Sequence, residues 1–228
     1  MSLPDTQSKK AISGQYLPTV LLTGFDAFGG DTVNPSWLAV QALQGEVIAG
    51  HAVVAGQLPT AFATSATTLK RLIRQHQPVL VICVGQAGGR SALSIERVAI
   101  NVMDARIADN LGAQPIDQPV VKSGPAAYFS TLPIKAIMQA INQAGLPAEI
   151  SQTAGTFVCN QVFYALLHML KKQRGLHPVS AGFIHVPYLT GQGSPSLTLR
   201  QMAEGLRIAV VAALTRKTDL VLGAGSLS

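Results

Sequence analysis

The chain has 228 residues, of which 48% are hydrophobic and 12% are charged. This length lies near the upper range of one domain, and the apolar content is enough for a full core, so we expect a single domain over residues 19–228. No apolar stretch approaches the roughly 18 residues of a membrane span, and the N-terminus lacks a secretory pattern, which predicts a soluble, cytoplasmic protein with no membrane partner.

The formal net charge of +6 makes nucleic acid the first partner to consider. The basic residues are scattered in small groups with no aromatic residues between them, so we expect no nucleic-acid partner. The cysteines and histidines never fall at the spacing of metal ligands, and the glycine loops lack the spacing of a phosphate cradle. We therefore predict no metal and no cofactor.

The first half of the chain alternates between strands and helices. Residues 1–18 are polar and carry no period, which predicts a flexible N-terminal extension. A buried strand is expected at 20–23, followed by a glycine-bounded loop at 24–30. Asn34 followed by Pro35 is a common helix start. An extended segment at 52–58, a helix at 61–75, a strand at 79–84 and a second glycine loop at 85–90 complete this half.

The second half continues the alternation. We expect a strand at 94–102, a polar loop at 104–125, a helix at 130–143, a strand at 149–153, a helix at 158–172, a strand at 179–186 and a helix at 196–215. The alternation predicts an α/β protein, a three-layer α/β/α sandwich with a largely parallel (mixed) central sheet. In such folds the site lies at the carboxyl ends of the strands, where the loops at Gly24, Gly85 and Pro187 are expected to gather.

Cys159 is the strongest candidate for a reacting group. It follows a polar, glycine-containing turn and stands at the start of an amphipathic helix, where unpaired backbone N–H groups and the helix dipole favour a thiolate. Cys83 instead lies inside an apolar strand, which is typical of a structural thiol. Both are expected to be reduced, as in a cytosolic protein.

His185 and Glu96 are the candidate partners of this thiol. His185 ends a buried strand, where a base can meet a thiol from a neighbouring element. His168 lies on the same helix as Cys159, more than two turns away, and cannot reach it. Glu96 is the one carboxylate in an apolar strand. It either orients the imidazole or forms an ion pair with a neighbouring arginine, and the sequence leaves both open.

Two aromatic residues in the first glycine loop stand out, because aromatic residues make up only 5% of the chain. Phe25 and Phe28 could wall a small, flat, uncharged ligand. Packing against the glycines of their own loop explains them equally well.

These segments together resemble the pyroglutamyl peptidase I family, also called pyrrolidone carboxyl peptidases, which are cytosolic cysteine peptidases. The resemblance runs from Val20 to about Leu214. It rests on the motifs Thr-Gly-Phe-Asp-Ala-Phe-Gly-Gly at 23–30 with Asn-Pro-Ser at 34–36, Gly-Gln-Ala-Gly-Gly-Arg at 85–90, Glu-Arg-Val-Ala-Ile-Asn at 96–101 with Asp-Ala-Arg at 104–106, and the segments around Cys159 and His185.

The resemblance implies release of an N-terminal 5-oxoproline residue from peptides. It assigns Cys159 as nucleophile, His185 as base and then acid, and Glu96 as the group that orients His185. It further implies a homotetramer. The residues it places around the thiol and the substrate are Phe25, Phe28, Gln86, Arg106, Phe157 and Val158, with Arg106 supporting the thiolate or the oxyanion.

Two other readings stay open at this point. Related α/β sandwiches carry nucleoside phosphorylase and peptidyl-tRNA hydrolase activities, which need no thiol. The chain could also be a non-catalytic module that binds modified peptide N-termini.

Overall fold

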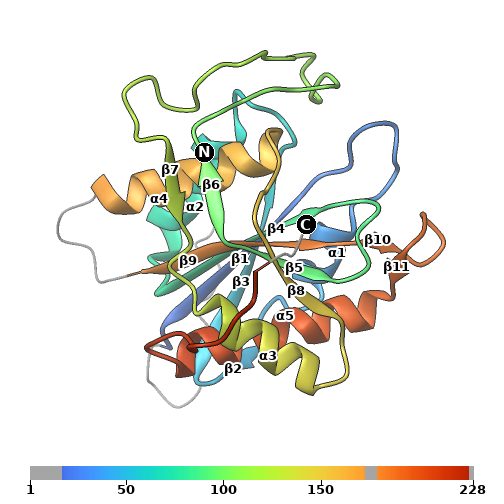
Figure 1. Ribbon diagram of the computed structural model, residues 1–228, viewed down its shortest axis with the longest axis vertical. Helices are drawn as coiled ribbons and strands as arrows, with labels where there is room; N and C mark the ends of the chain where they lie inside the picture. The colour runs from blue at the N-terminus through green and yellow to red at the C-terminus, as the bar shows by residue number, and fades with distance from the viewer. Residues whose placement is uncertain (1–16, 173–178, 226–228) are drawn as a thin grey trace, which may run out of the picture.

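The computed structural model describes residues 17–172 and 179–225, so the predicted N-terminal extension lies outside the described residues except for positions 17 and 18. Within them, a seven-stranded central sheet has the order β2-β3-β1-β4-β9-β5-β8 (Figure 1). Its strands are β1 (Thr19–Phe25), β2 (Val47–Ile48), β3 (His51–Leu58), β4 (Leu80–Gln86), β5 (Leu93–Glu96), β8 (Ala148–Ser151) and β9 (Ser180–Val186).

Among the described residues, five helices and two small two-stranded ribbons surround this sheet. The helices are α1 (Pro35–Gln41), α2 (Ser65–His76), α3 (Ile134–Gln143), α4 (Val158–Lys172) and α5 (Leu199–Thr215). One ribbon pairs β6 (Val98–Ile100) with β7 (Ala127–Phe129), and the other pairs β10 (Tyr188–Leu189) with β11 (Ser196–Leu197).

The sheet is mixed but mostly parallel. Strand β1 runs parallel to β3 and β4, β4 runs parallel to β9, and β5 runs parallel to β8. Only β2 against β3 and β5 against β9 are antiparallel. The predicted three-layer α/β fold is confirmed.

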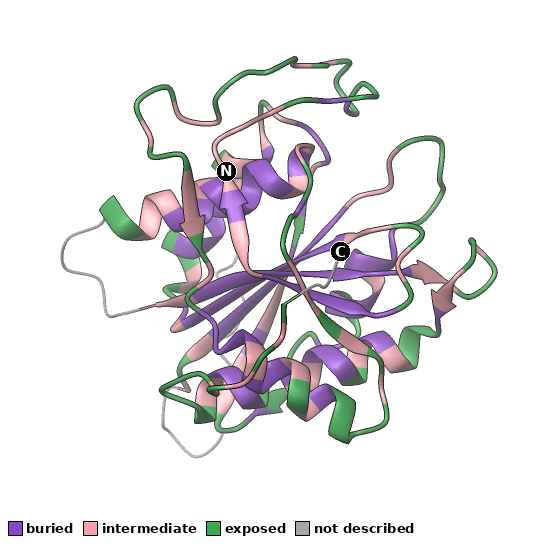
Figure 2. Cartoon of the chain, in the orientation of Figure 1, coloured by how far each residue is buried: buried purple, intermediate pink, exposed green. Residues whose placement is uncertain are grey.

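The central strands are buried on both faces, which explains their continuous apolar sequences (Figure 2). On one face, residues such as Leu22, Ile82 and Ile184 pack with α1, α3 and α5. On the other face, residues such as Val81 and Phe183 pack with α2 and α4. Helix α1 begins where predicted, because the Asn34 side chain accepts a hydrogen bond from the N–H of Ser36 and Pro35 opens the first turn.

Four predicted boundaries are wrong. Helix α2 starts at Ser65 rather than at residue 61. The single strand expected at 94–102 is two strands, because the chain leaves the central sheet at Arg97 and β6 pairs with β7 instead. Helix α3 starts at Ile134 rather than near residue 130, directly after Pro133. Helix α5 starts at Leu199 because Thr198 and Gln201 form a capping box, while Ser196 and Leu197 belong to β11.

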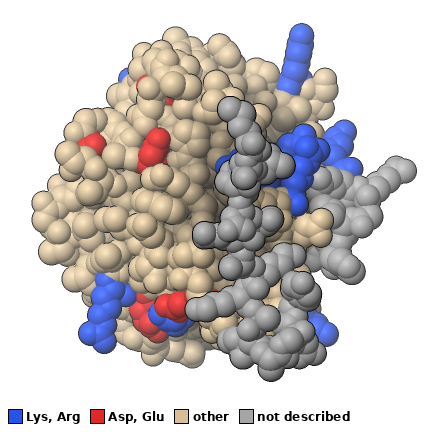
Figure 3. Space-filling view, turned by 180° about the vertical axis from the view of Figure 1, so that it is seen from behind, with Lys and Arg blue, Asp and Glu red and all other residues tan. Residues whose placement is uncertain are grey.

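The surface carries its charges in separate groups. On the face drawn in Figure 3, Lys and Arg side chains stand at several places rather than along one stripe. Among the described residues, no helix has the length and apolar character needed to cross a membrane.

Candidate active site

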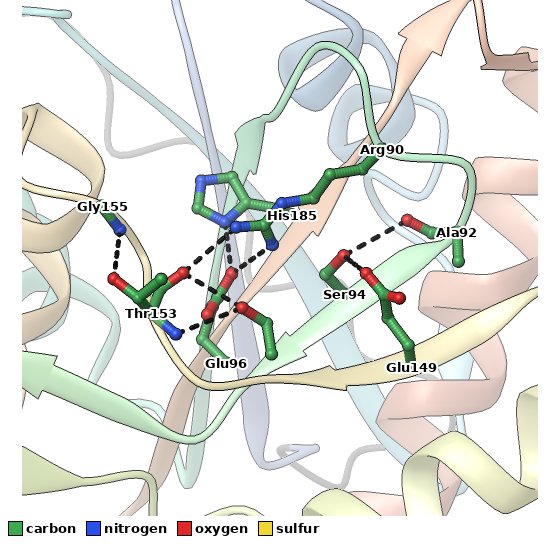
Figure 4. Close-up of polar contacts among 9 residues, drawn as sticks. Arg90, Ala92, Ser94, Glu96, Glu149, Thr153, Gly155 and His185 are labelled. Carbon is green, nitrogen blue, oxygen red and sulfur yellow. Dashed lines mark hydrogen bonds and ion pairs between the residues drawn. The ribbon is translucent and has the colours of Figure 1, made fainter. Parts of the chain in front are cut away.

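The side chains of Glu96 and His185 meet at the carboxyl end of β9. Glu96 ends β5 and is fully buried, and His185 lies one residue before the end of β9 and is only 4% exposed. His185 Nδ1 and Glu96 Oε1 are 2.7 Å apart (Figure 4). Since a carboxylate only accepts, Nδ1 carries the proton and Nε2 remains available as a base.

The sulfur of Cys159 lies on the same face of the sheet. A Cβ atom added to Gly85 would stand 2.8 Å from Cys159 Sγ, so the sulfur packs directly over this glycine. Gly85 is the register partner of His185 across the parallel pair of β4 and β9. Register partners project to the same face of a sheet, so the imidazole and the thiol share one side of the strand ends.

Two buried amides fix the first turn of α4, directly after Cys159. The Asn160 side chain accepts from the N–H of Ile100 at 3.0 Å and donates to the carbonyl of Ile100 at 2.9 Å. The Gln161 side chain accepts from Ser65 Oγ at 2.8 Å and donates to the carbonyl of Phe62 at 2.9 Å. The turn that carries Cys159 is therefore anchored to β6 on one side and to the start of α2 on the other.

Burial dominates the electrostatics at Cys159. It raises the pKa of this thiol to about 12, and the carboxylate of Glu96 pushes in the same direction, while Arg90 and the backbone N–H of Cys159 lower it. The helix start thus acts in the predicted direction, but the expectation that it favours a thiolate is not met, because desolvation outweighs it. Burial at this position therefore favours the thiol over the thiolate.

The structure brings the guanidinium of Arg90 to this site. Arg90 Nη1 lies 2.7 Å from Glu96 Oε1, on the same oxygen that faces His185. Arg106 is exposed on the loop after β6, and its expected role at the thiol stays a prediction. Glu96 therefore has both partners that the sequence offered as alternatives, an imidazole and an arginine.

The predicted aromatic residues fall into two environments. Phe25 is 2% exposed and packs in the core, with its ring centroid 6.4 Å from that of Phe183. Phe28 and Phe157 are only partly buried, and their centroids are 6.1 Å apart. Phe62, which the sequence analysis did not single out, stands edge-on to Phe157 at 5.2 Å. The sequence could have pointed to Phe62, because aromatic residues are scarce in this chain.

The remaining predicted residues flank the thiol. Val158 precedes Cys159 and is fully buried. Gln86 ends β4, one residue beyond Gly85, and is partly exposed.

Asp26 holds the loop that carries Phe28, although the sequence analysis assigned it no role. Its carboxylate accepts from the N–H of Thr60 at 2.6 Å and from Asn110 Nδ2 at 3.2 Å, so it joins this loop to the long loop after β6. Among the described residues, no group of three or more His, Cys, Asp or Glu side chains is placed to hold a metal ion.

A thiol at a helix start, sharing one face with an imidazole that is hydrogen-bonded to a buried carboxylate, is the arrangement of a cysteine-dependent hydrolase. The family model described as pyroglutamyl peptidase matches residues 18–216. The chain therefore belongs to the pyroglutamyl peptidase family.

Individual relatives are similar to this protein over nearly its whole length. It is 55% identical over 216 residues to pyrrolidone-carboxylate peptidase 1 of Ralstonia nicotianae, covering 92% of this chain and 100% of that one. It is 50% identical over 210 residues to the pyrrolidone-carboxylate peptidase of Bacillus cereus, covering 90% and 97%. The crystal structure of pyroglutamyl peptidase I from Bacillus amyloliquefaciens superposes with a TM-score of 0.86 at 47% identity, covering 89% and 100%.

Proposed function

We propose that this protein is a cysteine peptidase that hydrolyses the bond after an N-terminal pyroglutamyl residue, with Cys159, His185 and Glu96 as its catalytic residues. The observation that carries the proposal is the hydrogen bond from His185 Nδ1 to Glu96 Oε1 at 2.7 Å, on the face where Cys159 Sγ packs over Gly85. It leaves His185 Nε2 available to serve as the base for this thiol.

In the proposed reaction, His185 takes the proton of Cys159, and the sulfur attacks the carbonyl carbon of the pyroglutamyl residue. The C–S bond forms, backbone N–H groups at the start of α4 stabilise the oxyanion, and the C–N bond then breaks. The leaving amine takes the proton from the imidazolium. Water, deprotonated by His185, hydrolyses the thioester, and the proton returns to the sulfur as pyroglutamate leaves. Glu96 keeps the imidazole in the reactive tautomer throughout.

The substrate ring fits an uncharged slot. We assign its walls to Phe28 and Phe157, with Phe25 and Val158 behind them, and the lactam contact to the backbone of Gln86. A pyroglutamyl ring has no ammonium group, so it can enter such a slot without leaving a charge unpaired. A free N-terminal amine cannot.

We also propose that the protein works as a cytoplasmic homotetramer, with residues 19–228 as one domain. Support comes from the resemblance to cytosolic family members and from two free thiols, which suit a reducing compartment. We expect the enzyme to need no metal or cofactor.

Turnover of matched chromogenic amides tests the function. The purified protein should cleave a pyroglutamyl anilide, and it should reject the prolyl anilide, which has the same ring with a charged amine and no lactam carbonyl. We expect a difference in kcat/KM on the order of 10⁴-fold, because a desolvated amide contact is lost and a charge is buried. Equal rates on both, or no cleavage of the first, would contradict the proposal.

Enlarging Gly85 tests the place of the sulfur. In Gly85→Ala, the new Cβ would lie 2.8 Å from Cys159 Sγ and 2.9 Å from the Phe183 ring, so the sulfur or the ring must move. We expect kcat/KM on the pyroglutamyl anilide to fall by about 10²-fold, since shifts of about 1 Å misalign a nucleophile by that much. The control is Gly223→Ala, where the added carbon meets nothing within 4 Å. Full activity of Gly85→Ala would place the reacting thiol elsewhere.

A further inference from the structure

One oxygen of the buried Glu96 carboxylate serves two donors. Glu96 Oε1 lies 2.7 Å from His185 Nδ1 and 2.7 Å from Arg90 Nη1, while Oε2 is buried without a hydrogen-bond partner among the described residues. A buried carboxylate is costly unless a cation compensates it. If His185 is to be neutral and act as a base, the compensating charge must come from Arg90, whose guanidinium never loses its proton.

The same guanidinium also reaches the segment that carries the nucleophile. Arg90 Nη2 donates to the carbonyl of Thr153 at 3.1 Å (Figure 4). Thr153 belongs to the turn before α4, where its side chain accepts from the N–H of Gly155 at 3.0 Å. This turn ends four residues before Cys159. A planar fork that donates in two directions fixes both acceptors relative to each other.

We propose that Arg90 is a positioning residue of this site, whose guanidinium holds the Glu96 carboxylate against His185 and ties it to the turn that leads into Cys159. The inference rests on the proposed function, because it deepens the same site. Arg90 lies in the loop between β4 and β5, and its side chain reaches Thr153, which stands 63 positions later in the chain.

The charges around the thiol give this role a measurable sign. The charged and titratable groups that act on Cys159 are Glu96 from β5, Arg90 from the β4–β5 loop and Cys83 from β4. His185 of β9 lies on the same face of the sheet. The charge of Arg90 lowers the pKa of Cys159 and that of Glu96 raises it. Removing Arg90 leaves Glu96 uncompensated, so the thiol should become harder to ionise.

The first test compares kcat/KM on the pyroglutamyl anilide. Arg90→Met should lose about 10²-fold, the lower part of the range that a positioned acid or base contributes. The matched control is Arg97→Met. Arg97 is the arginine next to Glu96 in sequence, but its side chain donates to the carbonyl of Ala224 at 3.4 Å. It should keep the wild-type value. Arg90→Lys should recover only part of the loss, because an ammonium restores the charge without the fork.

The second test follows alkylation of Cys159 by iodoacetamide against pH and uses no substrate. In Arg90→Met the rise of the rate should move to higher pH than in the wild type and in Arg97→Met, whereas Arg90→Lys should stay near the wild type. Thermal unfolding establishes which variants are folded. If Arg90→Met does not fold, Arg90→Lys serves as the test. A lower kcat/KM together with an unshifted alkylation profile in Arg90→Lys would support the positioning role of Arg90.

The outcomes separate the two proposals. Unchanged kcat/KM and an unshifted alkylation profile in folded Arg90→Met would overturn the role of Arg90, as would full kcat/KM in Arg90→Lys. If the wild type cleaves no pyroglutamyl amide but the alkylation profile of Arg90→Met is still shifted, the role of Arg90 is upheld and the proposed substrate is overturned.

Discussion

Replacing Cys159 with alanine should reduce kcat on a pyroglutamyl anilide by about 10⁵- to 10⁶-fold, because no other group at the site can form the acyl intermediate. Cys159→Ser should be nearly as inactive, since a buried hydroxyl is a far weaker nucleophile than a thiol and His185 is placed for the sulfur. Steady-state turnover at saturating substrate measures both variants.

Cys83→Ala is the matched control for this loss. Cys83 is fully buried in β4, and burial raises the pKa of its thiol to about 12. We expect this variant to unfold at a lower temperature, because it leaves a small cavity, while each folded molecule keeps its turnover. Full turnover in Cys159→Ser would instead favour a phosphorylase or a peptidyl-tRNA hydrolase. A wild type that binds the pyroglutamyl amide without cleaving it would favour a binding module.

Replacing His185 with alanine should lower kcat/KM by about 10⁴-fold, the upper part of the range for a general base. The effect is expected to be this large because Cys159 is held as a thiol, so attack depends on proton removal by the imidazole. In His185→Ala, alkylation of Cys159 by iodoacetamide at neutral pH should slow as well, which separates loss of the base from loss of substrate binding.

His168→Ala is the control for the histidine substitution. His168 lies on α4 like Cys159, but its ring accepts or donates a hydrogen bond with Tyr128 Oη at 2.9 Å and stacks on Tyr164. It should alter stability and leave kcat/KM at the wild-type value. A larger loss of kcat/KM in His168→Ala than in His185→Ala would reassign the base.

The order of elements was predictable because its signals are local. Strands β1, β4 and β9 are short apolar runs between glycine or proline residues. The start of α1 is marked by Asn34 and Pro35. A parallel sheet brings the carboxyl ends of such strands together, so Gly85 and His185 could be expected near one edge. Cys159 and His185 could therefore be predicted as the thiol and the base from their positions in these elements alone.

Long-range pairing was not predictable in the same way. Nothing near Arg97 in sequence says that the chain leaves the central sheet there, because the partner of β6 is β7, about 30 residues later. The two roles offered for Glu96 could not be separated either, since both partners are distant or lie across a loop. The balance at Cys159 depends on how deeply the helix start is buried, which is a property of the whole packed molecule.

The anchoring of the first turn of α4 has a consequence for biosynthesis. Asn160 and Gln161 hold Cys159 in place through bonds to residues 60 and 96 positions away. His185 arrives still later from the ribosome, on the strand that closes the middle of the sheet. A nascent or damaged chain thus carries the thiol without its assembled site, and hydrolysis becomes a sensitive reporter of complete maturation.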